Sequence, residues 1–200
     1  MDKSRVEAFT DAVLAIILTI MILEFKTPVS FSIWAIDNQL PYLISYAIGY
    51  LFIGTAWYNH HYMFAKTHRI TKAVYWANNF WMFTTSFLPV ATSWVGRGFN
   101  EQGPEIFYGI VYFLWSLAYL LLSKTLILAN ISDRHEKAAN SIRQMRIYRF
   151  MSNWKLVLIQ VILVVLGLIY VPATQMLIVT LEIVFVGARF NKDSDRLFNS

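Results

Sequence analysis

The sequence predicts an all-α membrane protein with six transmembrane helices in each subunit. Hydrophobic residues make up 57% of the 200-residue chain, charged residues make up 14%, and the mean hydropathy is +0.48. This is far more apolar surface than the core of a soluble domain of this length could bury. The apolar residues also fall into long runs, which approach the ~20 residues that a helix needs to cross the hydrocarbon of a bilayer.

Five of these apolar runs are long and a sixth is shorter. Each is predicted to form one transmembrane helix, with Pro172 in a tight turn before the last, because proline resists continuing a helix. The sixth run contains Glu182, for which we predict a structural pair with Arg189. No internal repeat or flexible linker is found, so residues 1–200 are expected to form a single domain. The six predicted spans are Val6–Phe25, Leu40–Phe64, Ala73–Trp94, Ile106–Leu128, Trp154–Val171 and Gln175–Ala188.

The longest polar segment, Asn130–Asn153, connects the fourth and fifth predicted spans. It is rich in arginine and is expected to be helical in part, from Arg134 onward. Its predicted role is to orient the protein and to contact lipid headgroups, which is a simpler interpretation than ligand binding.

Lysine and arginine predict the orientation of the chain. If the amino terminus is cytoplasmic and the chain crosses six times, Lys26 and Arg97 are the only two of the 17 cationic residues left outside. Positive residues favour the cytoplasmic side, so both termini are predicted to be cytoplasmic. This topology, with attraction to anionic lipids, accounts for the isoelectric point near 9.4. Nucleic acid is therefore not an expected partner, whereas membrane lipids are.

Polar residues on the first three predicted helices are expected to meet near the cytoplasmic leaflet. Polar groups at membrane depth need hydrogen-bonding partners, and charged ones are costly. The simplest prediction is a structural network that ties the three helices together and fixes the rotation of the first; a direct role in binding ions is the less favoured interpretation. Its predicted members are Arg5, Asp11, Trp57, His60, His61, Asn78 and Asn79.

Enzymatic, metal and cofactor chemistry are not expected. The chain contains no cysteine, which excludes disulfides and thiolate metal ligands. Adjacent helical residues point about 100° apart, so His60 and His61 are poorly placed to bind one metal ion. The sequence also contains no nucleophile elbow, no glycine-rich phosphate loop and no zinc-helix motif.

The first helix has an apolar face defined by helical spacing. Ile16, Thr19, Ile20 and Leu23 share this face through i, i+3, i+4 and i+7 spacing. Periodicity alone does not tell whether the face lines a pore or packs against another helix.

Three motifs resemble those of the transmembrane protein 175 family of potassium channels. Arg5, Phe9 and Asp11 match the family's Arg-x-x-x-Phe-Ser-Asp signature, and Thr10 replaces the serine but keeps its hydroxyl. The segments WYNHH, at Trp57–His61, and NNFWMFTTSFLP, at Asn78–Pro89, resemble the family's second-helix and third-helix motifs. The rest of the chain is similar only in hydropathy. A single six-helix unit resembles the prokaryotic members, which implies the plasma membrane of a prokaryote.

The resemblance implies that the first helix lines the central pore of a homotetramer. Mapped residue by residue, Ile16 corresponds to the principal hydrophobic constriction, and Thr19 and Leu23 form the next layers outward, with Ile20 on the same face. Phe9 and Thr10 then belong with the structural network. Potassium is the implied permeant ion and no cofactor is implied. The carboxylate of Glu24 is expected at the outer mouth, where it would attract cations or simply be solvated.

The predicted function is therefore a weakly discriminating potassium channel without a TVGYG filter. A narrow hydrophobic ring favours the ion that sheds its water more readily, which is potassium rather than sodium. A secondary cation or proton transporter is the alternative, but no span before Pro172 contains the Gly-Pro interruption typical of a midplane transport site. A non-conducting scaffold also remains open.

The predicted topology can be tested with single cysteines, because the chain contains none. Ser200→Cys should resist a membrane-impermeant thiol reagent applied to intact cells, whereas Ser30→Cys, in the first predicted outer loop, should react. Labelling of Ser200→Cys from outside would contradict the six-span topology.

Overall fold

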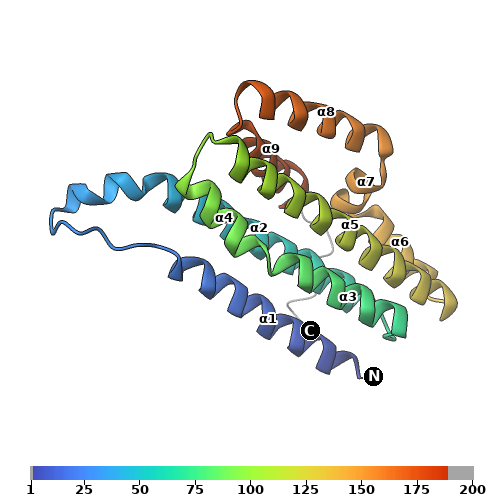
Figure 1. The fold of residues 1–200 in the computed structure, drawn as a ribbon. Coiled ribbons are helices and arrows are strands. Elements are labelled where there is room, and N and C mark those ends of the chain that lie inside the picture. Colours follow the sequence, from blue (N-terminus) through green and yellow to red (C-terminus); the bar gives the residue numbers. More distant parts are fainter. Residues whose placement is uncertain (1, 189–200) are drawn as a thin grey trace.

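The protein is described by a computed structural model that covers residues 2–188. This part of the chain consists of helices and connecting loops without β-strands, which confirms the predicted all-α class (Figure 1). In chain order the elements are α1 (Lys3–Leu23), η1 (Ile33–Gln39), α2 (Leu40–Ala65), α3 (Lys72–Thr85), α4 (Leu88–Arg97), α5 (Gln102–Ser132), α6 (Glu136–Gln144), α7 (Arg146–Ser152), α8 (Trp154–Tyr170), α9 (Thr174–Glu182) and η2 (Ile183–Gly187).

The first two predicted spans correspond to α1 and α2. The Asp2 carboxylate caps the start of α1 by accepting a hydrogen bond from the Ser4 backbone N–H at 3.3 Å. Pro41 lies in the first turn of α2, where its missing N–H leaves no helical hydrogen bond unmade. The short helix η1 precedes α2, and the two together form one apolar segment.

The third predicted span, Ala73–Trp94, is divided into two helices, so a single uninterrupted helix was a wrong expectation. α3 ends at Thr85 and α4 begins at Leu88. Pro89, in the first turn of α4, explains the break, because its ring would clash with the carbonyl four residues earlier in a continuous helix. The turn keeps its own hydrogen bonds, since the Phe87 N–H donates to the Thr84 carbonyl at 3.3 Å.

The second half of the chain contains one long helix and several shorter ones. α5 contains the fourth predicted span, and the polar segment after it is helical from Glu136, close to the expected Arg134. α7 and α8 meet at an angle of 78°, and α8 matches the fifth predicted span. The sixth corresponds to α9 and η2, while Arg189, the expected partner of Glu182, lies outside the described residues. Glu182 instead accepts a hydrogen bond from the Tyr112 hydroxyl.

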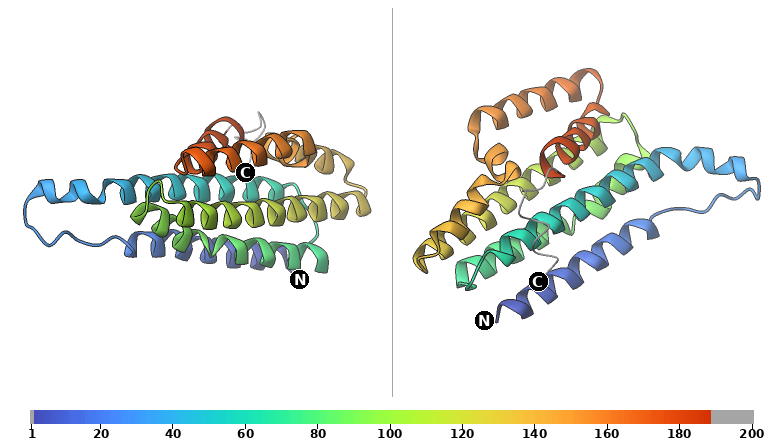
Figure 2. Two further views of the ribbon diagram at one scale, coloured as in Figure 1. Left: turned by 45° about the horizontal axis from the view of Figure 1, so that its top comes forward. Right: turned by 180° about the vertical axis from the view of Figure 1, so that it is seen from behind.

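α2, α3, α4 and α5 form the centre of the bundle, with α1 against one side and α7 to η2 against the other (Figures 1 and 2). The core between α3 and α5 is aromatic, with Trp81, Trp115 and Tyr119 fully buried. The Trp115 indole N–H donates to the Thr85 hydroxyl at 3.1 Å, so a hydrogen bond supplements this packing. In contrast, no residue of α8 is fully buried.

Two glycines allow α2 and α4 to lie unusually close. A Cβ atom added at Gly96 of α4 would come within 2.8 Å of the Tyr42 Cα atom of α2. A Cβ atom added at Gly49 of α2 would come within 3.1 Å of the Thr92 Oγ1 atom of α4. Small residues at such contacts are how helices approach each other in a bilayer, where apolar burial between them offers little gain.

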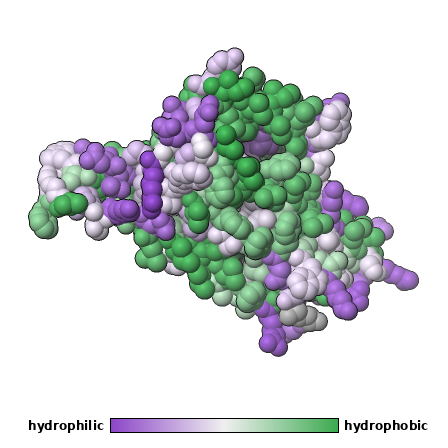
Figure 3. All heavy atoms as spheres, in the orientation of Figure 1, coloured by the Kyte–Doolittle hydropathy of each residue, from purple (hydrophilic) through white to green (hydrophobic). Residues whose placement is uncertain are grey.

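The surface has the pattern expected of a membrane protein. Hydrophobic residues cover the middle of the visible face and the region of α8, and hydrophilic residues gather toward the two ends (Figure 3). Among the described residues, α1, the η1–α2 segment and α5 are long and apolar enough to cross a membrane. The bent pair of α7 and α8 provides a fourth such segment, and α9 with η2 is a shorter apolar helix.

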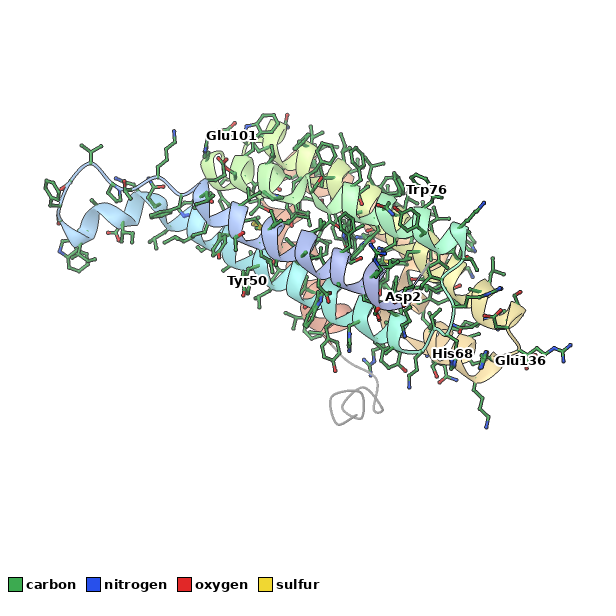
Figure 4. The ribbon with its side chains drawn as sticks, turned by 90° about the horizontal axis from the view of Figure 1, so that it is seen from below. Asp2, Tyr50, His68, Trp76, Glu101 and Glu136 are labelled. Atoms are coloured by element: carbon green, nitrogen blue, oxygen red, sulfur yellow. The ribbon has the colours of Figure 1, made fainter. Side chains whose placement is uncertain are left out.

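The connections fall at opposite ends of the bundle. Asp2, His68 and Glu136 lie at one end, and Glu101 lies at the other (Figure 4). At the first end Arg69 forms an ion pair with Asp133 at 2.9 Å, which joins the α2–α3 loop to the end of α5. We call this end the basic end, because cationic residues that were predicted to be cytoplasmic, such as Arg69, lie here.

The glycine contact leads to a test with a matched control. Gly96→Ala should destabilise the protein by about 1–3 kcal/mol, because the backbone of Tyr42 has no room to accept the added methyl group. Gly54→Ala, in α2, where nothing lies within 4 Å of the added Cβ atom, should be neutral or slightly stabilising. Thermal unfolding of the purified variants measures both effects, and equal midpoints would refute the close contact.

Candidate functional site

α1 is divided lengthwise into a buried side and an exposed side. The buried residues recur every three or four positions, as expected when a helix packs along one face. They contact the α2, α3 and α4 side of the bundle, and they are Val6, Thr10, Leu14, Ile17 and Met21. The opposite side of α1 faces away from the bundle.

The exposed side carries a stripe of large apolar residues. Phe9 is 55% exposed, Ile16 57% and Leu23 77%. These residues are seven positions apart, so they lie on one line along the helix, separated by roughly 10 Å each. Ile20 and Thr19 are exposed on either side of this line. We call these five residues the α1 stripe; it contains all four residues predicted from the sequence to line a pore.

The hydroxyl of Thr19 has a defined orientation within the α1 stripe. It donates a hydrogen bond to the Ile16 carbonyl of its own helix, with 2.9 Å between the oxygens. Since the proton is directed at the backbone, the lone pairs of the hydroxyl oxygen remain available on the exposed side. The stripe therefore presents oxygen acceptors one turn beyond Ile16.

On the buried side of α1, a chain of hydrogen bonds crosses three helices. The Thr10 hydroxyl, fully buried, donates to the Val6 carbonyl at 2.8 Å. It accepts a hydrogen bond from the Asn78 side-chain amide of α3, also at 2.8 Å. The Asn78 carbonyl oxygen in turn contacts the His60 Nε2 atom of α2 at 2.8 Å. We call Thr10, Asn78 and His60 the buried triad.

The order of donors in the buried triad follows from the Thr10 hydroxyl. Its single proton is used on the Val6 carbonyl, so it must accept from the Asn78 nitrogen. This leaves the Asn78 oxygen toward His60, whose Nε2 atom must then carry a hydrogen. The His60 ring is fixed further by stacking on Trp81, with ring centroids 4.9 Å apart and planes 9° from parallel.

A direct hydrogen bond between α1 and α2 lies nearer the surface. The Trp57 indole N–H donates to the Asp11 carboxylate at 2.8 Å, and the His61 ring stacks on Trp57 at 6.1 Å. The charge of Asp11 is therefore held against a fixed donor, which reduces the cost of placing a carboxylate on an apolar helix.

Three members of the predicted network lie elsewhere. Asn79 donates to the Tyr75 carbonyl of its own helix at 2.8 Å and does not reach α1. Arg5 is exposed, and no hydrogen bond or ion pair joins it to the network within residues 2–188. Phe9 belongs to the α1 stripe instead. Adjacent helical positions point about 100° apart, so Asn78 and Asn79 cannot both face α1.

The end of α1 away from the basic end is held by contacts that the sequence analysis did not predict. Arg97 of α4 forms an ion pair with Glu24 at 2.8 Å, and the Ser93 hydroxyl donates to the same carboxylate oxygen at 3.3 Å. The Tyr42 hydroxyl of α2 donates to the Met21 carbonyl. Glu24 is therefore paired with a cation of the same chain, a contact that the expectation of a carboxylate attracting cations or simply solvated did not include. The sequence did contain a signal for this ion pair, because Glu24 and Arg97 carry opposite charges and were predicted on the same side of the membrane.

The described residues contain no group of three or more histidine, aspartate or glutamate side chains that could hold a metal ion. The chemistry that the site offers is instead that of an apolar helix face that carries one hydroxyl, that of Thr19.

The sequence matches a known family over the helices that build this site. The profile of the family described as endosomal/lysosomal potassium channel TMEM175 matches residues 5–89, which contain the α1 stripe and the buried triad. A protein described as a potassium channel from Chryseobacterium sp. (strain P1-3) is 38% identical over 127 residues, which cover 64% of this chain and 66% of the relative. The chain belongs to the TMEM175 family.

Other members of the TMEM175 family show how far the likeness extends. A protein described as a potassium channel from Streptomyces collinus is 30% identical over 129 residues, covering 62% of this chain and 63% of that protein. The matched part thus amounts to slightly less than two thirds of the length of both relatives. The crystal structure of a protein from Chamaesiphon minutus, described as a homologue of the lysosomal potassium-selective channel TMEM175, has a TM-score of 0.72 at 20% identity. The match covers 93% of this chain and 98% of that one, so the likeness in fold extends beyond residues 5–89, which the family profile matches.

The neighbouring asparagines provide a test of the buried triad. Asn78→Ala should destabilise the protein by roughly 1–3 kcal/mol, because the Thr10 and His60 groups lose a buried partner. Asn79→Ala removes the same side chain one position away and should change stability by less than about 0.5 kcal/mol. The thermal midpoints of the two purified variants measure the difference.

A substitution on α1 complements this test. Thr10→Ser, which keeps the hydroxyl, should be tolerated, whereas Thr10→Val, which keeps the volume, should resemble Asn78→Ala. If Asn78→Ala and Asn79→Ala were equally mild, the buried triad would not be what positions α1.

Proposed function

We propose that this protein is a potassium-permeable cation channel in which copies of the chain surround a pore lined by the α1 stripe. The observation that carries the proposal is the α1 stripe itself, a line of large apolar residues held facing outward by hydrogen bonds on the opposite side of the same helix. Family membership and the relatives described as potassium channels support the same function.

Pore formation requires several copies of the chain. One helix cannot enclose a path for ions, so identical subunits must close around a symmetry axis. The family resemblance implies four subunits. In this arrangement the α1 stripes of the four subunits face the axis, and each residue of the stripe forms a ring of four.

Selectivity would arise at the narrowest apolar ring, for which we propose Ile16. An ion must shed part of its water to pass, and potassium gives up water at lower cost than sodium. The Thr19 oxygens, available one turn further out, would replace some of the lost water. Phe9 would form a further apolar ring about two turns toward the basic end, and Leu23 the outermost one.

The proposed topology has six crossings with the basic end in the cytoplasm. α3 and α4 together supply the third crossing, and α9 with η2 supplies the sixth. This arrangement places both termini inside and leaves Lys26 and Arg97 outside, in agreement with the positive-inside rule. We place the protein in the plasma membrane of a prokaryote.

The break between α3 and α4 is not strong support for the alternative function, a transporter. In transporters, an unwound segment exposes backbone groups that bind the ion. Here the Ser86 N–H donates to the Met82 carbonyl at 3.0 Å and the Ala91 N–H to the Phe87 carbonyl at 3.0 Å, so the groups of the turn bond to each other. A channel is therefore the better explanation.

Two substitutions in the α1 stripe test the pore. Ile16→Asn should raise conductance and reduce the preference for potassium over sodium severalfold, because a smaller polar ring wets more easily and lets ions keep their water. Thr19→Val should alter selectivity and leave assembly intact, since it removes only the hydroxyl at nearly constant volume. Potassium and sodium flux into liposomes that contain the purified protein measures both effects.

Ile22→Asn is the matched control, because Ile22 is exposed on α1 but lies beside the α1 stripe, about 120° around the helix from Ile16. It should leave ion preference unchanged. If wild-type protein conducts potassium but Ile16→Asn and Thr19→Val behave like wild type, the pore lies elsewhere. If wild-type protein shows no flux under either ion gradient, the proposed channel function is itself wrong.

A further inference from the structure

Two exposed apolar edges of the bundle lie on either side of α1. In Figure 4, α1 lies in front of the rest of the bundle, with Tyr50 of α2 at one edge and Trp76 of α3 at the opposite edge. Tyr50 is 48% exposed and Trp76 is 67% exposed, so neither edge is covered within the chain. If the α1 stripe faces the axis of a ring of copies, these two edges are the ones turned toward the neighbouring copies.

The edge formed by α3 and α4 exposes a line of mostly aromatic side chains. The exposed residues recur every three or four positions, as expected for one side of a helix. The line continues across the break between the two helices, because the rings of Phe83 and Phe87 contact each other there with centroids 5.2 Å apart. We call this line the aromatic stripe; it consists of Trp76, Phe80, Phe83, Phe87, Val90 and Trp94, all of them exposed.

The edge formed by α2 has smaller side chains. Its exposed or partly exposed residues also recur every three or four positions, and two of them, Ala47 and Gly54, carry nothing larger than a methyl group. A Cβ atom added at Gly54 would have no neighbour within 4 Å in the same copy. Small residues of this kind let a second helix approach closely in a bilayer. We call this line the α2 stripe; it consists of Leu40, Ile44, Ala47, Leu51 and Gly54.

Phe83 of the aromatic stripe and Gly54 of the α2 stripe lie at matching depths. The contact between His60 and Asn78 sets α2 and α3 at the same depth at that point. Gly54 lies six residues along α2 from His60, or roughly 9 Å farther from the basic end. Phe83 lies five residues along α3 from Asn78, or roughly 7.5 Å farther from it. Because rotation about the membrane normal does not change depth, Phe83 of one copy comes to the depth of Gly54 in the next.

The two edges also carry opposite charges near the basic end. Lys72 lies one turn before the aromatic stripe, is exposed, and forms no ion pair with a described residue. On the other edge, Glu7 and Asp11 lie four positions apart on the side of α1 where the Trp57 indole of α2 holds Asp11. Glu7 has only a long ion pair of 3.9 Å with Lys3. Counted from the hydrogen bond that joins α1 to α3, Lys72 is roughly 4.5 Å nearer the basic end than Glu7, which its flexible side chain can span.

We propose that the aromatic stripe of each copy packs against the α2 stripe of the next copy, with Lys72 facing Glu7 and Asp11 across the contact. This contact presupposes the ring of copies in the proposed function and supplies the surfaces that hold the ring together. Each copy offers a different edge to each neighbour, so the contact is head-to-tail and repeats until the ring closes.

Lipid is the weaker occupant of the aromatic stripe. On α8, the consecutive residues 161–163 are all exposed, and every exposed large side chain in Leu156–Ile169 is aliphatic, which suits a helix surrounded by acyl chains. Tryptophan near the membrane surface is common on lipid-facing helices and would account for Trp76 and Trp94. It does not account for the phenylalanines between them, such as Phe83, whereas aromatic side chains are enriched where proteins contact each other.

Paired cysteines test the contact in native membranes, because the chain contains no cysteine of its own. Under mild oxidation, the double variant Gly54→Cys, Phe83→Cys should form a ladder of disulfide-linked chains up to the full ring, and neither single variant should. The matched control is Gly54→Cys, Trp94→Cys, which uses the same two edges. Trp94 lies eleven residues beyond Phe83, or roughly 16 Å, so this pair is too distant to form a disulfide.

Substitutions that keep the chain free of cysteine test the packing and the charges. Gly54→Trp should abolish the full ring in native mass spectrometry of the purified protein, whereas Ile159→Trp, exposed on α8, should not. Lys72→Glu should lower the fraction of full ring severalfold, and adding Glu7→Lys should restore it in part. Lys137→Glu, which reverses an exposed cation of α6, should have no effect. Far-ultraviolet circular dichroism confirms that each variant is folded.

The outcomes separate this contact from the proposed channel function. A wild-type ring that conducts potassium, together with no ladder from Gly54→Cys, Phe83→Cys, would overturn the contact and leave the channel standing. A full ladder from that pair, with no potassium flux through the wild-type protein in liposomes, would support the contact and overturn the channel. Equal ladders from the paired variant and from its Trp94 control would also overturn the contact, since depth would then not matter.

Discussion

The buried triad of Thr10, Asn78 and His60 is the constraint on which the arrangement of the first three helices depends. An unpaired polar group in hydrocarbon costs several kcal/mol, so the three side chains have one favourable arrangement, in which all are paired. That arrangement fixes which side of α1 faces α3. A rotation of α1 by one residue, about 100°, would separate Thr10 from Asn78 and would turn the α1 stripe toward the bundle.

α1 is held at both ends, and these contacts leave its opposite face free. Near the basic end, Trp57 holds Asp11; near the other end, Arg97 holds Glu24 and Tyr42 holds the Met21 carbonyl. Between these points the contact is apolar, through residues such as Leu14 and Ile17. An isolated apolar helix in a bilayer has no preferred rotation, so the polar contacts provide the orientation and the apolar contacts provide the packing.

The two sides of the bundle differ in how tightly they pack. α2 and α4 approach closely through Gly49 and Gly96, and α3 packs on α5 through large aromatic side chains, so the centre is dense. α8 contributes no fully buried residue and leaves a groove beside α5. The dense packing of this centre holds α1 at one rotation, which the proposed pore requires, whereas the side of α8 is packed more loosely.

Most of the helical order was predictable from the sequence, because long apolar runs must be helical at membrane depth to pair their backbone groups. α1, α2, α5 and α8 begin and end within several residues of their predicted spans. The third span was predicted as one helix because hydropathy takes no account of the steric clash that Pro89 causes. The proline in the sequence did indicate a break in the helix. In the site, the predicted topology assigned Asp11, Trp57, His60 and Asn78 to a structural network, and helical spacing placed Ile16 and Thr19 on one face of the first helix.

The sequence by itself determined the all-α membrane class, the approximate spans, the clustering of positive charge at one end and the polar residues that need partners. Each of these follows from composition or spacing along one chain. Only the tertiary structure decided that Asn78 rather than Asn79 reaches Thr10, that the face of α1 with Phe9, Ile16 and Leu23 is left exposed, and that Arg97 pairs with Glu24. These depend on the rotation and depth of one helix relative to another, which the packing of the whole bundle sets and which no local pattern encodes.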